Sequence, residues 1–202
     1  LWKYAAGYEI PLMNDAGQFV CYRETGFHDP HSMIVFKGVD GSSQGFSNRT
    51  SWIAGDRYEK KYTLIFPDTP TDYDVDWIVL DQLRGDGFAG PQVGLYLQDG
   101  VFSVRKFESL PSTFVHYPIS VSLSTGVSID FRWDIVLSAG GGGDPTPVTK
   151  LWADETLVYE SSAANFAGTS SIENTVGNYQ STDQSKTNSV LIDSYELWHE
   201  AA

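Results

Sequence analysis

Short hydrophobic runs separated by turn residues form the main pattern of the chain. Runs rich in valine, isoleucine, tyrosine, phenylalanine, tryptophan and threonine recur between clusters of glycine, aspartate, proline and serine. β-Branched and aromatic residues favour strands, whereas glycine, proline and aspartate favour the turns between them. The pattern predicts strands near residues 17–23, 31–37, 60–66, 75–84, 92–98, 101–107, 113–123, 127–138, 148–153, 156–160, 172–180 and 188–199.

Two of the predicted connections have the form of tight hairpin turns. Asp99 and Gly100 stand between two apolar runs, and an Asp-Gly pair accepts the positive φ angles of a two-residue turn. Asp154 and Glu155 occupy the equivalent place between the next pair of runs. About a dozen strands joined by such turns indicate an all-β fold, and we predict a jelly-roll (concanavalin-like) sandwich of two antiparallel sheets. We expect residues 1–202 to form one domain, because sandwiches of this length commonly remain undivided.

The composition supports a folded domain that needs no disulfide bond for stability. The chain has 202 residues, of which 41% are hydrophobic and 14% aromatic, and this places it well outside the disordered range. Its single cysteine, Cys21, cannot form an internal disulfide and lies in a strand-like run. We therefore interpret Cys21 as a structural thiol.

The charge of the chain excludes several partners. Thirteen lysines and arginines face 26 aspartates and glutamates, which gives a formal net charge of −13. This balance argues against nucleic acid and against anionic membranes, since both bind mainly through basic residues. No apolar run approaches the roughly 18–20 residues of a membrane span. A chain that starts at Leu1 is expected to be a processed form or a piece of a longer protein. The acidic charge suits a salty exterior, and we expect a location outside the cell or on the surface of a cell or virion.

Three segments carry polar residues that could act together. Arg49 lies in the first segment, Gln82 and Arg84 lie two residues apart in the second, and Tyr179 and Gln180 lie in the third. Alternate residues of a strand point to the same face, so Gln82 and Arg84 share a face. If the three segments are neighbouring strands of one curved sheet, these side chains converge on a groove.

The order and spacing of these residues resemble the jelly-roll polysaccharide lyases, which include alginate lyases and the heparin-lyase-like and glucuronan-lyase-like domains. Those families carry an Arg-x-Glu strand, a Gln-x-His strand and, near the end, a Lys-x-Gly-x-Tyr strand. The counterparts here are Arg49, then Gln82 with Arg84, then Gly177 with Tyr179. The sequence departs from the pattern at Ser51 in place of glutamate and at Arg84 in place of histidine, and the lysine before the Gly-x-Tyr pair is absent.

The resemblance implies β-elimination on a uronate-containing polysaccharide. In that reaction Arg49 and Gln82 would neutralise the sugar carboxylate, Arg84 and Gln180 would bind substrate, and Tyr179 would transfer the proton. Arg84 cannot replace the histidine as a base, because a guanidinium group stays protonated.

Two other functions remain open at this stage. The same scaffold could be a non-catalytic domain for glycan binding or adhesion, or a structural module of a virus particle, tail fibre or extracellular assembly. The expected partner is an acidic or neutral polysaccharide. No cofactor is implied, although 26 acidic residues would allow a calcium site that the sequence does not place. We expect the following tryptophans to belong to the core and not to sugar platforms: Trp52, Trp77, Trp133, Trp152 and Trp198.

Overall fold

A computed structural model describes the greater part of the chain, and its elements are strands apart from one short 3-10 helix, η1 (Pro70–Tyr73). The described residues are 2–3, 23–28, 31–37, 45–50, 55–73, 76–85, 92–109, 113–138, 143–165, 172–180 and 188–200. They form two sheets in which every pairing between neighbouring strands is antiparallel. The predicted all-β sandwich of antiparallel sheets is confirmed.

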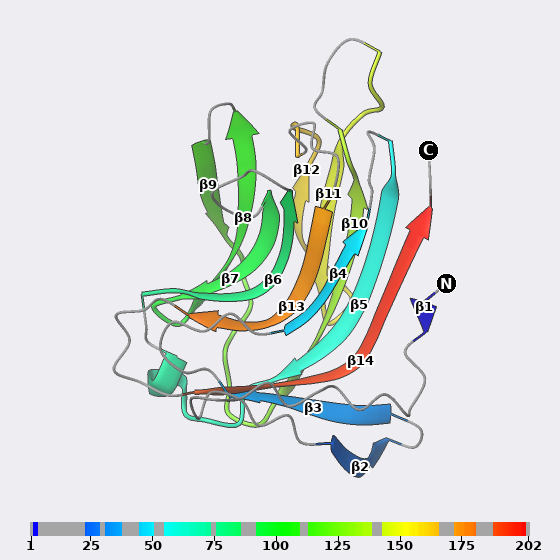
Figure 1. The fold of residues 1–202 in the computed structure, drawn as a ribbon. Coiled ribbons are helices and arrows are strands. Elements are labelled where there is room, and N and C mark those ends of the chain that lie inside the picture. The colour runs from blue at the N-terminus through cyan, green and yellow to red at the C-terminus, as the bar shows by residue number, and fades with distance from the viewer. Residues whose placement is uncertain are drawn as a thin grey trace.

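The larger sheet has eight strands. Its order is β12 (Thr156–Ser161), β11 (Val148–Ala153), β10 (Ser128–Val136), β5 (Arg57–Ile65), β14 (Ser189–Glu200), β3 (His31–Lys37) and β2 (Arg23–His28), with β1 (Trp2–Lys3) paired to β14. The smaller sheet has six strands, in the order β4 (Gly45–Thr50), β13 (Ile172–Gln180), β6 (Ile78–Gly85), β7 (Val93–Gln98), β8 (Val101–Ser109) and β9 (Thr113–Pro118). Both sheets bend in the same direction, and the smaller one lies on the inner side of the bend (Figure 1).

Local sequence signals agree well with the observed strands. Each predicted run from 31–37 onward contains a strand, and most ends agree within a few residues. The run predicted at 113–123 is too long, because β9 ends at Pro118, which has no N–H for the sheet ladder. Strand β4 was not among the predicted runs, since its sequence is largely polar. The run at 17–23, including Cys21, lies outside the described residues except for Arg23.

Both predicted hairpin turns are confirmed. Asp99 and Gly100 have φ angles of 49° and 73°, and Asp154 and Glu155 have φ angles of 46° and 63°. Two consecutive positive φ values are the signature of a type I′ turn, which matches the twist of antiparallel strands. The residues that flank the first turn, Gln98 and Val101, accordingly pair across the ladder.

The core lies between the facing surfaces of the two sheets. Along β5 and β10 alternate residues are buried, as expected for strands with one face on the core and one on solvent. The core combines aromatic and aliphatic side chains from both sheets; among the largest that are fully buried are Tyr58, Tyr62, Phe66, Phe102, Phe131 and Trp133.

One charged pair is buried within this apolar layer. Lys60 on β5 binds Asp81 on β6, and each side chain is only 1% exposed. The Tyr62 hydroxyl donates to the second carboxylate oxygen of Asp81 at 2.7 Å, and the Trp133 indole N–H donates to the Tyr62 hydroxyl at 3.0 Å. Burial lowers the pKa of Lys60, and the charge of Asp81 opposes this shift. The pair therefore links the two sheets, because neither charge is tolerated in the buried layer without the other.

Removing one partner of this pair should destabilise the fold strongly. We expect Asp81→Leu to lower the free energy of unfolding by about 3–5 kcal/mol, because it leaves the Lys60 ammonium buried without a counter-charge. The double variant Lys60→Met/Asp81→Leu should recover a large part of the loss, since it removes both charges. Urea unfolding of the three proteins measures the difference.

The exposed pair between Arg57 and Asp134 provides the matched control. Its nitrogen and oxygen lie 2.9 Å apart, but the Arg57 side chain is 53% exposed. Arg57→Ala should therefore cost no more than about 1 kcal/mol. An Asp81→Leu variant that loses as little as Arg57→Ala would contradict the role assigned to the buried pair.

Candidate functional site

The two faces of β6 separate core residues from candidate site residues. Asp81 and Leu83 are buried toward the larger sheet, whereas Gln82 is partly exposed and Arg84 is exposed. The predicted division of this strand, with Gln82 and Arg84 on one face, is confirmed. We call the face of the six-stranded sheet that is turned away from the larger sheet the concave face, because the sheets bend around it (Figure 1).

The three strands that carry the predicted site residues are neighbours in this sheet. β13 lies between β4 and β6 and pairs with both. Arg49 lies opposite Glu173, which in turn lies opposite Arg84, so their backbones form one row across three strands. In the same ladder Gln82 lies opposite Thr175, and Tyr179 lies opposite Val79.

This pairing brings the segments together, but it does not define the whole predicted site. With strands about 4.8 Å apart, the backbones of Arg49 and Arg84 are separated by ~10 Å. The side chains of Arg49, Tyr179 and Gln180 lie outside the described residues. A catalytic arrangement of these three with Gln82 and Arg84 therefore stays a prediction.

A second row of polar residues on the concave face was missed in the sequence. It runs from Gln82 on β6 to Gly94 on β7, Arg105 on β8 and His116 on β9, each residue opposite the next. In β8 Arg105 is only partly buried, whereas the residues on either side of it, Val104 and Lys106, are fully buried. Ser103 and Phe107, two positions before and after Arg105, are buried as well, so the sequence of β8 carries no clear signal for its face. Only the strand order brings Arg105 to Gln82.

Arg105 is held in place by aromatic residues. Its Nη1 donates to the Tyr96 hydroxyl at 2.9 Å. The guanidinium carbon lies 4.2 Å from the centre of the Phe114 ring and 5.4 Å from that of Tyr96. Such contacts are cation–π interactions, which stabilise arginine without neutralising its charge. Arg105 thus presents a fixed positive charge on the concave face.

His116 stands next to Arg105 at the end of this row. Its ring contacts Tyr96 edge to face at 5.1 Å between ring centres, and Nδ1 lies 3.3 Å from the Ser103 hydroxyl oxygen. Partial burial, and then the charge of Arg105, lower the pKa of His116 from its usual value of 6.5. The imidazole is consequently neutral at pH 7 and can act as a hydrogen-bonding group or a base.

Gly94 lies between Gln82 and Arg105 in this row, at a position where the structure leaves no room for a side chain. A Cβ atom at Gly94 would lie 2.6 Å from the carbonyl oxygen of Asp81 and 3.1 Å from Cε2 of Tyr96. The first distance is too short for any side chain, and its partner is rigid backbone. The position therefore requires glycine, because the Asp81 carbonyl and the Tyr96 ring already occupy the space beside its backbone.

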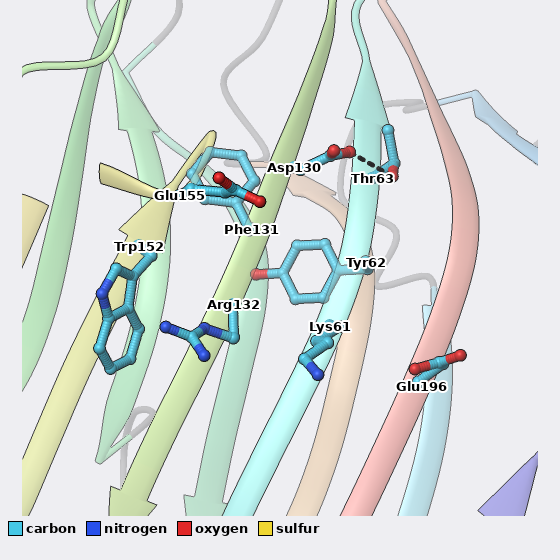
Figure 2. Close-up of a pocket in the computed structure, with 9 residues that line it drawn as sticks. All are labelled: Lys61, Tyr62, Thr63, Asp130, Phe131, Arg132, Trp152, Glu155 and Glu196. Atoms are coloured by element: carbon cyan, nitrogen blue, oxygen red, sulfur yellow. Dashed lines mark hydrogen bonds between the residues drawn. The ribbon is translucent and has the colours of Figure 1, made fainter. Parts of the chain in front are cut away.

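A separate pocket lies on the outer surface of the larger sheet (Figure 2). Its volume is about 620 Å³. Arg132 stacks on Trp152 with 4.0 Å between the guanidinium carbon and the ring centre, and Thr63 donates to Asp130 at 2.6 Å. We call this the outer pocket; its lining residues are Lys61, Tyr62, Thr63, Asp130, Phe131, Arg132, Trp152, Glu155 and Glu196.

The outer pocket changes the interpretation of the tryptophans. Trp133 is only 1% exposed and belongs to the core, as expected. Trp152 and Trp198 are instead partly exposed, and Trp198 lies under the ammonium group of Lys61 at 4.6 Å from its ring centre. The expectation of a core position is wrong for Trp152, which lines the outer pocket because its position on β11 faces away from the other sheet.

Neither a metal site nor a membrane span is found in the described part of the chain. Within those residues no group of three or more histidine, cysteine, aspartate or glutamate side chains is arranged to hold a metal ion. Among the same residues, no helix has the length and apolar character needed to cross a membrane. The calcium site that the acidic composition allowed thus has no position in the described structure.

Comparison with known proteins gives matches in structure only. No protein-family model matches the chain, and no curated protein matches it in sequence. An endo-β-1,4-glucuronan lyase from the fungus Trichoderma reesei superposes with a TM-score of 0.62 at 16% identity, over 97% of this chain and 90% of that one. Alginate lyase AlyC3 in complex with dimannuronate gives 0.65 at 10% identity, over 84% and 75% of the two chains.

A third similar structure is alginate lyase A1-II′, a member of polysaccharide lyase family 7. Its TM-score is 0.59 at 16% identity, and the match covers 94% of this chain and 86% of that one. Identities this low carry information about architecture alone. The chain therefore has the jelly-roll fold of the glucuronan and alginate lyases.

Proposed function

We propose that this protein is a polysaccharide lyase that cleaves a uronate-containing polysaccharide by β-elimination on its concave face. The observation that carries the proposal is the adjacency of β4, β13 and β6, which bear Arg49, Tyr179 and Gln82. This adjacency occurs in a fold shared with lyases of two uronate polymers, glucuronan and alginate. Polysaccharides of this class are found outside the cell, so we propose an extracellular location for the activity.

The reaction requires three operations on one sugar unit. The C5–H bond breaks as a base takes the proton, a C4–C5 double bond forms, and the C4–O4 bond breaks as O4 receives a proton from an acid. The C5 proton is barely acidic until the neighbouring carboxylate is neutralised by positive charge and hydrogen bonds. We assign that neutralisation to Arg49 and Gln82, substrate binding to Arg84 and Gln180, and proton transfer to Tyr179.

The charge distribution on the concave face supports an anionic substrate. The whole chain has a net charge of −13, which would repel a polyuronate. On β6 to β9, however, the described side chains that face away from the core include the charged groups of Arg84 and Arg105 and no carboxylate; Asp81 points into the core. These two arginines give β6 to β8 a local positive charge, which suits an acidic polysaccharide; on the neighbouring strand β13, Glu173 lies in the row between Arg49 and Arg84.

Substitution of Tyr179 tests the assigned chemistry. Tyr179→Phe removes only a hydroxyl group, and loss of general acid–base catalysis should lower the cleavage rate about 100- to 10,000-fold. The rate is measured from the ultraviolet absorbance of the unsaturated product with glucuronan and alginate as substrates. Tyr159→Phe on β12 of the larger sheet is the matched control and should cleave at the rate of the unchanged protein. Equal product release from Tyr179→Phe would rule out this mechanism.

Glycan binding without cleavage is a second candidate function, and the outer pocket is the observation that favours it. Its volume of about 620 Å³ is within the usual range for ligand sites. The partly exposed Trp152 offers an indole surface for a sugar ring, and Asp130, Glu155 and Lys61 offer hydrogen-bonding groups around it. If this second function is correct, the concave face has no catalytic role and the outer pocket binds the glycan.

Substitution of Trp152 tests the second function. If the outer pocket binds glycans, Trp152→Ala should weaken binding about tenfold or more, which corresponds to ~1.4 kcal/mol of lost stacking and burial. Calorimetric titration with glycan oligomers measures the affinity. Leu157→Ala is the control, because Leu157 is exposed and lies opposite Trp152 in the ladder. An affinity that is the same in Trp152→Ala as in the unchanged protein would exclude the outer pocket as the binding site.

A further inference from the structure

We infer that Asn178 and Asn188 are positioning residues, which hold a β-bulge in β13 and thereby keep Tyr179 on the concave face. The inference rests on the proposed function for the role of Tyr179 in proton transfer. Both asparagines are buried, so they are assigned no contact with the sugar and no part in the chemistry itself. What they supply is the local backbone geometry on which the proton-transfer group depends.

The first observation is a β-bulge in β13 directly before Tyr179. Val176 lies opposite Asp81 on β6. Three residues later Tyr179 lies opposite Val79, which is only two residues from Asp81. One extra residue is therefore inserted in β13, at positions 177–178. A bulge of this kind interrupts the alternation of faces and changes the direction of the residues that follow it.

The bulge decides which residue of β6 stands opposite Tyr179. A regular ladder continued from Val176 would pair Tyr179 with Ile78, one residue further along β6. Ile78 is fully buried and belongs to the core. Residues directly opposite each other in a ladder share a face of the sheet. The regular register would thus assign position 179 to the core.

The observed register assigns the same position to the concave face. Tyr179 stands opposite Val79, and Val79 stands opposite Tyr96 on β7, so the three positions form one row. Neither Val79 nor Tyr96 belongs to the core cluster, and the Tyr96 hydroxyl accepts a hydrogen bond from Arg105 on the concave face. The extra residue in β13 is therefore what brings position 179 into this row.

The second observation is a chain of hydrogen bonds that holds the bulge. Nδ2 of Asn178 donates to Oδ1 of Asn188 at 2.9 Å, and Nδ2 of Asn188 donates to the backbone carbonyl of Asp72 at 3.1 Å. Asn178 belongs to the smaller sheet, Asn188 directly precedes β14 of the larger sheet, and Asp72 lies in η1. The bulge is therefore tied to two other parts of the fold.

These contacts exclude the regular register of β13. In that register Asn178 would stand opposite Val79, in the row of the concave face, and would lose its bond to Asn188. Buried amide groups are kept hydrogen-bonded in native structures, because loss of a partner costs free energy. The bond between the two asparagines thus favours the bulged register, and with it the concave position of Tyr179.

Alanine substitutions test the inference through the kinetics of cleavage. Asn178→Ala and Asn188→Ala each remove the contact that holds the bulge, and both should lower kcat about 10- to 100-fold, since a displaced catalytic group loses rate steeply. KM should change less than about twofold, because the contacts that bind the polymer are retained. The rate is measured from the ultraviolet absorbance of the unsaturated product with glucuronan and alginate.

Asn165 provides the matched control for stability. It is a third buried asparagine, and its side chain bonds the backbone of Ser138 and Val148 beside β10 and β11 of the larger sheet. Asn165→Ala should lower the urea midpoint as much as the other two variants do, yet leave kcat unchanged. An equal loss of kcat in Asn165→Ala and Asn178→Ala would show a general effect of destabilisation and overturn the positioning role.

Nitration of tyrosine tests the placement without any need for cleavage. Tetranitromethane modifies accessible tyrosine rings, and the masses of proteolytic peptides give the rate for each ring. Tyr179 should react about tenfold more slowly in Asn178→Ala and Asn188→Ala than in the unchanged protein and Asn165→Ala, because a slip of register turns it to the core. The partly exposed Tyr159 and the buried Tyr73 are the internal references.

A conservative variant keeps the test decisive if an alanine variant does not fold. Asn188→Asp retains Oδ1 as the acceptor for Asn178, and its protonated carboxyl group can still donate to the carbonyl of Asp72. It should therefore keep the Tyr179 nitration rate and most of kcat. A loss of both in Asn188→Asp, with the urea midpoint unchanged, would contradict the assigned contact.

The outcomes separate this inference from the proposed function. Cleavage by the unchanged protein, with the same kcat in Asn178→Ala and Asn188→Ala, would overturn the positioning role and leave the lyase proposal standing. Absence of cleavage, with Tyr179 nitration that depends on the two asparagines, would support the placement of Tyr179 and overturn the lyase proposal. A Tyr179 nitration rate that is the same in all variants would overturn the inference, whatever the rate of cleavage.

Discussion

The buried contact between Lys60 and Asp81 sets the orientation on which the concave face depends. Both groups lie in the layer between the sheets, where an unpaired charge is strongly unfavourable. Asp81 must therefore point toward β5, and the strict alternation of a strand then turns Gln82 and Arg84 to the opposite face. A slip of one residue would place Gln82 against Lys60 and expose the carboxylate, so the charged pair favours one register of β6.

This orientation also separates the charges of the protein. An acidic chain can keep a basic strip only where its carboxylates are directed elsewhere, and on β6 the single carboxylate is neutralised in the core. The charged groups of Arg84 and Arg105 then remain on the concave face, without a competing acidic side chain from β6 to β9 in the described residues. Partial burial, and then the charge of the neighbouring Arg105, lower the pKa of His116.

Local signals in the sequence were sufficient for much of the fold. The Asp99-Gly100 and Asp154-Glu155 turns and the two faces of β6 follow from residue type and alternation alone. The edge strand β4 was not among the runs predicted from the apolar pattern, because its sequence is largely polar, and only the resemblance treated the segment of Arg49 as a strand. The end of β9 was placed too late because the apolar residues after Pro118 continue the pattern of a strand.

The candidate site residues also fall into two groups, those that the sequence indicated and those that only the structure shows. Arg49, Gln82, Arg84, Tyr179 and Gln180 were selected because they lie in an order that resembles a known family, and the pairing of β4, β13 and β6 was needed to bring them together. Arg105 and His116 carry no motif. Their position beside Gln82 depends on the order of strands β6, β7, β8 and β9 and on Gly94 between them. Neither can be deduced from residues that are neighbours in the sequence.

The most direct measurement is a crystal structure of the Tyr179→Phe variant with a bound tetramer of glucuronate or mannuronate. The account predicts that the sugar chain lies on the concave face across β4, β13 and β6, with a carboxylate within hydrogen-bond distance of Arg49 and Gln82. A tetramer bound only in the outer pocket against Trp152, with the concave face bare, would contradict it.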